Sequence, residues 1–127
     1  MTKKKQNDKQ LAYIRFTGMG SDVFGISVPD LITITLRDWE ELFGDIELIF
    51  AGPKRIILYL GKSSLFDKDL REFFATKNFR NQSEKMVVVV QDDFQEVLMH
   101  AAAHEGIASG NILITYNERE AEKIILK

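Results

Sequence analysis

The chain has 127 residues, of which 45% are hydrophobic and 28% are charged, a balance typical of one globular domain. Its formal net charge of −2 provides no broad basic surface for the phosphates of a nucleic acid. There is no cysteine, which excludes disulfides, thiolate metal ligands and cysteine nucleophiles. The apolar runs are strand-sized, shorter than the roughly 18 residues of a membrane helix. We therefore expect a cytoplasmic protein that inserts into no membrane.

The first ten residues, "MTKKKQNDKQ", carry a basic run with no apolar segment behind it. That pattern is neither a secretory signal nor an amphipathic transit peptide. We expect residues 1–10 to form a disordered basic tail and residues 11–127 to form a single domain.

The domain is expected to begin with a strand in "LAYIRFTG", residues 11–18. Residues 19–33 fit no simple element, because they are apolar yet interrupted by Gly25 and Pro29. The alternation over residues 32–35 predicts an edge strand beside the first strand. We interpret residues 19–33 as an insert that either packs on the sheet edge or forms a partner surface.

A helix is predicted after Thr35, whose hydroxyl can cap the first amides while Asp38 adds negative charge to the first turn. Its apolar residues recur at helical spacing: Leu36, Trp39, Phe43, Ile46 and Phe50.

Three short apolar segments rich in Ile and Val follow at residues 55–60, 86–90 and 111–116. Such strands are typical of a parallel or mixed sheet covered on both faces. Helices are predicted between and after them, beginning near Ser64 or Asp67, at Asp93, and at Asn117. The third of the four predicted helices has the apolar stripe Phe94, Val97, Leu98 and Ala101, and the last has Glu120 placed to complete a capping box. The order, a strand followed by three αβ units and a closing helix, predicts an α/β layered domain.

The pair Asp92 and Asp93 follows a buried strand and precedes a helix, as in the first unit of a two-component receiver domain. A receiver also needs an acceptor aspartate and a lysine at the ends of later strands. The one strand that follows ends in Tyr116 and Asn117. We therefore interpret Asp93 as a helix cap with Glu96 as its capping-box partner, and Asp92 as favourable to the helix dipole.

His100 and His104 lie four residues apart, with Glu96 one turn earlier, so a metal could in principle meet all three. The chain has no H-E-x-x-H motif and no evident fourth ligand. We favour two histidines at the boundary of the apolar stripe. No catalytic motif is assembled, and we expect no enzyme, no metal and no cofactor.

Several segments together resemble the STAS domain, the fold of bacterial anti-sigma factor antagonists. "YIRFTG" resembles its first core strand, and "KRIILYLGKSSLFDKDLREFF" resembles the strand, loop and helix that carry its regulatory serine. "EKMVVVVQDDFQEVLMHAAAHEGI" and "ILITYNEREAEKII" resemble its last two units. The resemblance implies an α/β STAS-like layered domain with a mixed four- to five-stranded sheet, about four helices and a role in protein interaction.

The sequence departs from STAS switch proteins at their Asp-Ser-Ser-Gly motif. Aligned without gaps, the motif falls on Asp67, Lys68, Asp69 and Leu70, so the acceptor hydroxyl is absent. A shifted register would recruit Ser63 or Ser64 but lose the motif. A fixed carboxylate at Asp69 has less charge and fewer oxygens than a phosphoserine. The insert at residues 19–33 is a second departure.

Two functions remain open. The first is a non-catalytic regulatory module that binds another protein or a second copy of itself. Its expected partner-binding residues are Ser64, Leu65, Phe66, Asp67, Lys68, Asp69 and Arg71, although Leu65 and Phe66 equally fit a helix packed on the core. The second is a small-ligand domain that holds a nucleotide, lipid or other anion at the carboxyl ends of the strands. Its possible ligand-binding residues are Gly61, Lys62, Ser63, Gln91 and Asp92, of which Lys62 is the one cation.

Overall fold

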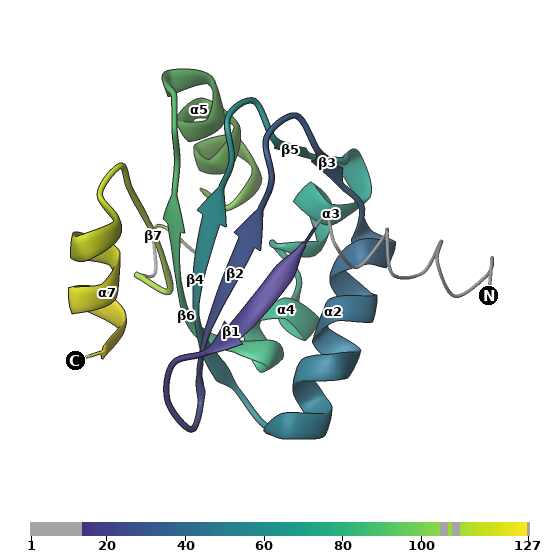
Figure 1. Cartoon of the computed structure of the whole chain (residues 1–127). Helices are drawn as coiled ribbons and strands as arrows, with labels where there is room; N and C mark the ends of the chain where they lie inside the picture. Colours follow the sequence, from purple (N-terminus) through teal and green to yellow (C-terminus); the bar gives the residue numbers. More distant parts are fainter. Residues whose placement is uncertain (1–13, 105–106, 108–109, 127) are drawn as a thin grey trace, which may run out of the picture.

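A computed structural model describes residues 14–104, 107 and 110–126, so the expected tail and residues 11–13 of the first strand lie outside the described residues. Figure 1 shows a twisted sheet with helices on both faces. The strands are β1 (Arg15–Gly18), β2 (Val23–Val28), β3 (Thr33–Ile34), β4 (Lys54–Leu60), β5 (Leu65–Phe66), β6 (Ser83–Val89) and β7 (Ile112–Thr115). The helices are α2 (Leu36–Ile49), α3 (Lys68–Phe73), α4 (Lys77–Gln82), α5 (Asp93–Ala102) and α7 (Glu118–Leu126).

The main sheet has five strands in the order β1-β2-β4-β6-β7. β1 is antiparallel to β2, and every other neighbouring pair is parallel. The mixed sheet of the expected α/β class is therefore confirmed. Where the sequence predicted one helix from Ser64 or Asp67 onward, the described chain has two, because Thr76 caps a new helix by accepting a hydrogen bond from the Phe79 amide.

Residues 23–28, in the middle of the stretch that we expected to be an insert, form strand β2 of the main sheet. β2 lies between β1 and β4 and pairs with both. Five of its six residues are buried, and its apolar side chains contribute to the cores on both faces of the sheet. The strand was not recognised from the sequence because Gly25 interrupts its apolar pattern. The absence of a side chain at Gly25 leaves room for Met19 and Tyr59, each of which would lie 3.2 Å from an added Cβ.

The edge strand expected at residues 32–35 is also placed differently. Its two strand residues, β3, pair with β5 in a separate two-stranded parallel sheet rather than with β1. β1 is already paired with β2, so its inner edge is not available. The β3–β5 pair joins the segment before α2 to the segment before α3.

The larger core lies between one face of the sheet and helices α2 to α5. Thr35 caps α2 as expected, and Asp38 completes a reciprocal capping box, with two backbone-to-side-chain bonds of 3.0 Å. Trp39, fully buried in this core, stacks on Phe43 with 4.8 Å between ring centroids and meets Phe74 edge to face at 5.3 Å. These contacts fix α2 and the end of α3 on the sheet.

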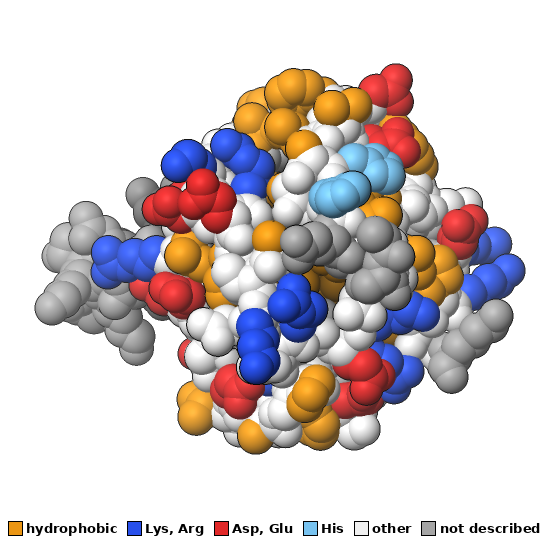
Figure 2. Space-filling view, turned by 180° about the vertical axis from the view of Figure 1, so that it is seen from behind, with side chains coloured by type: hydrophobic (Ala, Val, Ile, Leu, Met, Phe, Trp, Pro, Cys, Tyr) orange, Lys and Arg blue, Asp and Glu red, His pale blue; other side chains and the backbone are white. Residues whose placement is uncertain are grey.

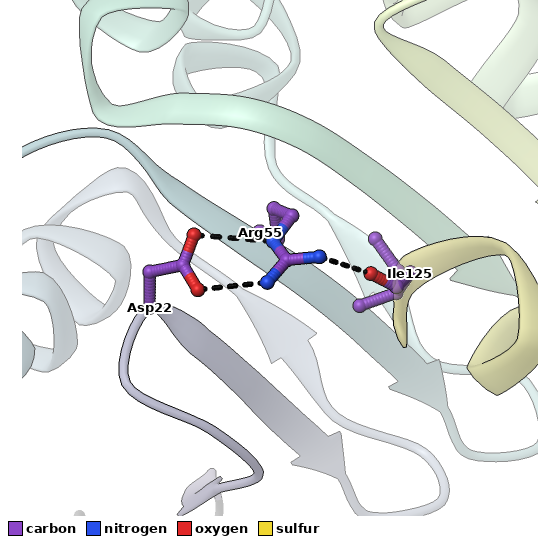
Figure 3. Close-up of polar contacts among 3 residues, drawn as sticks. All are labelled: Asp22, Arg55 and Ile125. Carbon is purple, nitrogen blue, oxygen red and sulfur yellow. Dashed lines mark hydrogen bonds and ion pairs between the residues drawn. The ribbon is translucent and has the colours of Figure 1, made fainter. Parts of the chain in front are cut away.

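The smaller core lies on the other face, where α7 packs on β4, β6 and β7 through Ala121 and Ile125. Asn117 caps α7 by accepting from the Glu120 amide at 3.0 Å. At the other end, Arg55 donates from Nη1 to the Ile125 carbonyl at 2.7 Å, which satisfies one of the carbonyls that a helix end leaves free (Figure 3).

Arg55 is held in turn by Asp22, which precedes β2. The Arg55 Nε and Nη2 atoms donate to the two Asp22 carboxylate oxygens at 3.1 and 2.9 Å (Figure 3). These hydrogen bonds lower the pKa of Asp22 below its usual value of 3.8, and the same pairing raises the pKa of Arg55. The pair therefore connects β2, β4 and the end of α7.

No helix in the described part of the chain has the length and apolar character needed to cross a membrane.

Candidate interaction surface

A buried glutamine joins the two loops that follow β4 and β6. The Gln95 side chain, on the first turn of α5, is only 2% exposed. Its Nε2 donates to the carbonyl oxygens of Gly61 at 2.8 Å and Ser64 at 2.9 Å, and its Oε1 accepts from the Gln91 amide at 2.7 Å. Gln95 thus occupies the space between the loops and satisfies their backbone groups. We did not predict this residue, because nothing in a sequence distinguishes a buried glutamine in a helix from a surface one.

The predicted ligand residues line these same loops, where much of their hydrogen-bonding capacity is used within the protein. The Gly61 carbonyl accepts from both Gln95 and the Ser64 hydroxyl. The Lys62 amide donates to the Asp30 carboxylate at 2.8 Å. Lys62 and Ser63 are exposed, and Ser63 has a φ of +56°. The geometry at this edge is that of two loops bound to each other.

Asp92 begins α5, which corrects the cap expected from the sequence by one residue. Asp92 accepts from the Gln95 amide at 2.8 Å, whereas Asp93 is the first residue of the helix proper. Both carboxylates still lie at the positive end of the helix dipole, where negative charge is favourable.

The strand order gives the sheet edge no opening of the kind that usually binds ligands. Open α/β sheets hold ligands where the strand order reverses and neighbouring connections leave on opposite faces. Here the parallel strands follow one another in one direction, β2-β4-β6-β7, and helices α2 to α5 all cover the same face. The parallel part of the sheet therefore contains no such reversal.

The predicted partner-binding residues divide into buried and exposed sets. Ser64 is 0% exposed and Phe66 is 3% exposed, so their side chains are not available to a partner in this structure. Phe66 belongs to the core because β5 lies against α3, and it meets the Phe74 ring at 5.3 Å. Leu65 is half-buried.

The remaining residues of that set are on the first turns of α3. Asp67 caps the helix by accepting from the Leu70 amide at 2.8 Å. Lys68 and Asp69 are exposed, and Lys68 forms a 3.2 Å ion pair with Glu72. Arg71 is half-buried and donates from Nη1 to the Phe66 carbonyl at 2.7 Å. The structure thus brings Lys68, Asp69 and Arg71 to the surface together, while Asp67 has a structural role.

Helix α5 presents its expected core stripe to solvent. Phe94 and Val97 are 61% and 63% exposed, whereas Gln95 and Met99 are buried. The cap at Asp92 and the anchored Gln95 side chain fix the rotation of the helix. The face that meets the core therefore contains Gln95 and Met99, the residues that directly follow Phe94 and Leu98. Two large apolar side chains consequently remain on the surface of the domain.

A groove of about 510 Å³ runs between α3 and α5. Its lining is apolar on the α5 side and mostly charged on the α3 side: Leu98, Ala101 and Ala102 face Lys68, Arg71, Glu72 and Ala75. Figure 2 shows hydrophobic side chains gathered next to the two histidines, which are exposed on α5 and just beyond it. We call the seven lining residues the α3–α5 groove.

Polar residues border the other side of α5. The Tyr116 hydroxyl lies 2.7 Å from an Asp93 oxygen and 2.8 Å from a Glu96 oxygen, and these hydrogen bonds raise the pKa of Tyr116. His100 lies 3.8 Å from Glu96. Within the described residues, no group of three or more histidine or acidic side chains is arranged to hold a metal ion.

No protein-family model and no curated protein matches the sequence. A solved structure is similar along most of the chain: an uncharacterized protein from the DUF3478 family with a SpoIIAA-like fold, from Shewanella loihica PV-4. The TM-score is 0.56, and the match covers 88% of this chain and 91% of that one. The chain has a SpoIIAA-like fold. At 15% identity the similarity concerns the fold alone, and it confirms the STAS-like layered domain predicted from the sequence.

Proposed function

We propose that this SpoIIAA-like domain is a non-catalytic regulatory module that binds another protein, and that the α3–α5 groove is its binding surface. The observation that carries the proposal is the groove itself, which has an apolar floor and a charged rim. The rim lies on α3, the helix for which the sequence predicted partner-binding residues. Protein interfaces commonly combine an apolar centre with a polar rim.

The lining of the groove indicates an amphipathic helix as the bound element. A groove between two surface helices accommodates a third helix, whose apolar face packs on the floor. Alanines form three of the four apolar positions, Ala75, Ala101 and Ala102, so the backbone of a partner can approach closely. Lys68 on the rim, 77% exposed in its side chain, suits an acidic residue at the edge of that helix.

The residues around α3 support a module without a phosphorylation switch. Lys68, Asp69 and Leu70 follow the capping Asp67, so none of the first three helical positions offers a hydroxyl. The Ser64 hydroxyl donates to the Gly61 carbonyl at 2.9 Å and is buried. A kinase would have to open the loop to reach it, whereas Ser63 is exposed but lies outside the aligned motif.

Small-ligand binding at the sheet edge has less support. Gln95 already satisfies the Gly61, Ser64 and Gln91 backbone groups that would face a ligand there. Lys62 is the one cation among the predicted ligand residues, which suits a multiply charged anion poorly.

The test is affinity purification of the tagged chain from its host, with wild type compared with Lys68→Glu and Ala75→Glu. The matched control is Lys77→Glu, because Lys68 and Lys77 are each the exposed first residue of a short helix. We expect one protein to be retained by wild type and the control, to be lost in both groove variants, and to bind purified wild-type protein directly.

Two outcomes would contradict the proposal. One is a retained protein that binds all four forms equally, which would place the contact elsewhere. The other is no retained protein together with a small molecule bound to the purified wild type, as detected by native mass spectrometry. Circular dichroism of each variant confirms that it is folded.

A further inference from the structure

The outer face of α5 carries an apolar stripe that the proposed binding groove does not absorb. Phe94, Val97 and Ala101 follow one another at spacings of three and four residues, which places them on one side of α5. All three are exposed, and only Ala101 also lines the groove. Contiguous apolar surface of this kind is characteristic of an interaction site.

The polar residues beside this stripe are complementary to the same residues on a second α5 that runs in the opposite direction. Asp93 and Glu96 lie toward the beginning of α5, and His100 lies toward its end on the same flank. Carboxylates accept hydrogen bonds, and an imidazole N–H donates them. When α5 meets a second α5 that runs in the opposite direction, acceptors on one helix therefore face the donor on the other.

We propose that two copies of this chain associate by packing α5 against α5 in an antiparallel pair about a two-fold axis. Such an interface is self-complementary, because each contact occurs twice with the residues exchanged. Val97 of each copy would pack on Ala101 of the other, and Glu96 would face His100. The small Ala101 side chain lets the two helix backbones approach closely.

The two-fold axis keeps each flank of α5 next to the same flank of the other copy. The Leu98 and Ala102 side, which opens into the α3–α5 groove, therefore lies on one side of the pair, and the Tyr116 side lies on the other. A pair would present two grooves on one surface, which favours a partner with two binding helices.

The interface is small. Helix α5 has ten residues and is therefore about 15 Å long, so the contact lies at the low end of stable interfaces and predicts a weak, concentration-dependent pair.

The test is sedimentation velocity on the purified full chain, from low micromolar to several hundred micromolar. For wild type we expect the weight-average mass to rise from 14.6 kDa toward twice that value. Val97→Asp should remain at the monomer mass throughout. The matched control is Leu48→Asp, an apolar residue on α2 that is 87% exposed, and it should associate like wild type.

Charge exchange tests the antiparallel arrangement. Glu96→Lys should weaken association, because a hydrogen-bond donor then replaces the acceptor that faces His100, and the double variant Glu96→Lys with His100→Glu should restore it. A wild-type chain that is monomeric at every concentration would overturn the proposal. Equal loss of association in Leu48→Asp and Val97→Asp would do the same, as would a monomer that uses Val97 to bind lipid vesicles.

This result is independent of the proposed partner, because the assay contains no other protein. Lys68→Glu and Ala75→Glu should leave the self-association unchanged, whereas Val97→Asp need not affect capture of a partner in the groove.

Discussion

Replacing Gln95 with leucine tests how the loops at the carboxyl end of the sheet are held. Leucine has a similar volume and suits a helix, so the change removes hydrogen bonds without opening a large cavity. Three bonds shorter than 3 Å are lost, to the Gly61 and Ser64 carbonyls and from the Gln91 amide.

The magnitude follows from where these three groups lie. Gly61 and Gln91 are near solvent, so water can replace part of each bond, and each loss costs about 1 kcal/mol. Ser64 is fully buried, and an unsatisfied carbonyl there costs about 1–3 kcal/mol. We therefore expect Gln95→Leu to lower the free energy of unfolding by about 3–5 kcal/mol, a large part of the stability of a small domain.

Urea unfolding, followed by the fluorescence of buried Trp39 and by circular dichroism, measures this difference. Gln91→Leu is the matched control, because the Gln91 residue is exposed and its backbone amide makes the hydrogen bond. It should change stability by less than about 0.5 kcal/mol. A loss of under about 1 kcal/mol in Gln95→Leu would refute the account of Gln95 as the group that ties the two loops together.

Two further predictions concern the ends of β4. Asp22→Asn should lower the Tm at pH 7, because the lowered pKa of Asp22 means that its carboxylate stabilises the fold above the usual value of 3.8. That stabilisation is lost as the pH falls through the lowered pKa, so melting curves of Asp22→Asn and wild type should converge in acid, and a constant difference would contradict the role of the Arg55 pair. Gly61→Ala should lower the free energy of unfolding by more than about 2 kcal/mol in urea, because its Cβ would lie 2.5 Å from the Pro29 carbonyl carbon, and an unchanged midpoint would show that the backbone can separate there.

The sequence was sufficient for most of the elements that are defined by local signals. The caps at Thr35 and Asn117 are confirmed, because each is a polar side chain placed before an apolar helical pattern. Of the two starts predicted for the next helix, Ser64 or Asp67, the structure has Asp67. The apolar runs within β4 and β6 were also recognisable, since strands covered on both faces of a sheet have continuous apolar runs.

Features that depend on tertiary contacts were not predictable in the same way. β2 contains Gly25, and its place between β1 and β4 depends on pairing with a strand some thirty residues later. The rotation of α5 depends on Gln95 reaching loop residues that are distant in the sequence, and this long-range contact left Phe94 exposed. A local pattern assigns the most apolar face to the core, and here that assignment was wrong.

In the candidate site, too, the residues with local signals were predicted and those that depend on tertiary contacts were not. Lys68, Asp69 and Arg71 were predicted from their position at the start of α3. The α5 side of the groove was missed, because it exists only when the two helices lie next to each other.

The most direct test of the central claim is photo-crosslinking inside the host cell. A photoreactive amino acid is placed at Ala75, which lines the groove, and in a second strain at Leu48, which is exposed on α2. Our account predicts that one protein is crosslinked from Ala75 and not from Leu48, and that the adduct disappears when Lys68→Glu is added. Equal crosslinking from both positions, or none from Ala75, would contradict a partner bound in the α3–α5 groove.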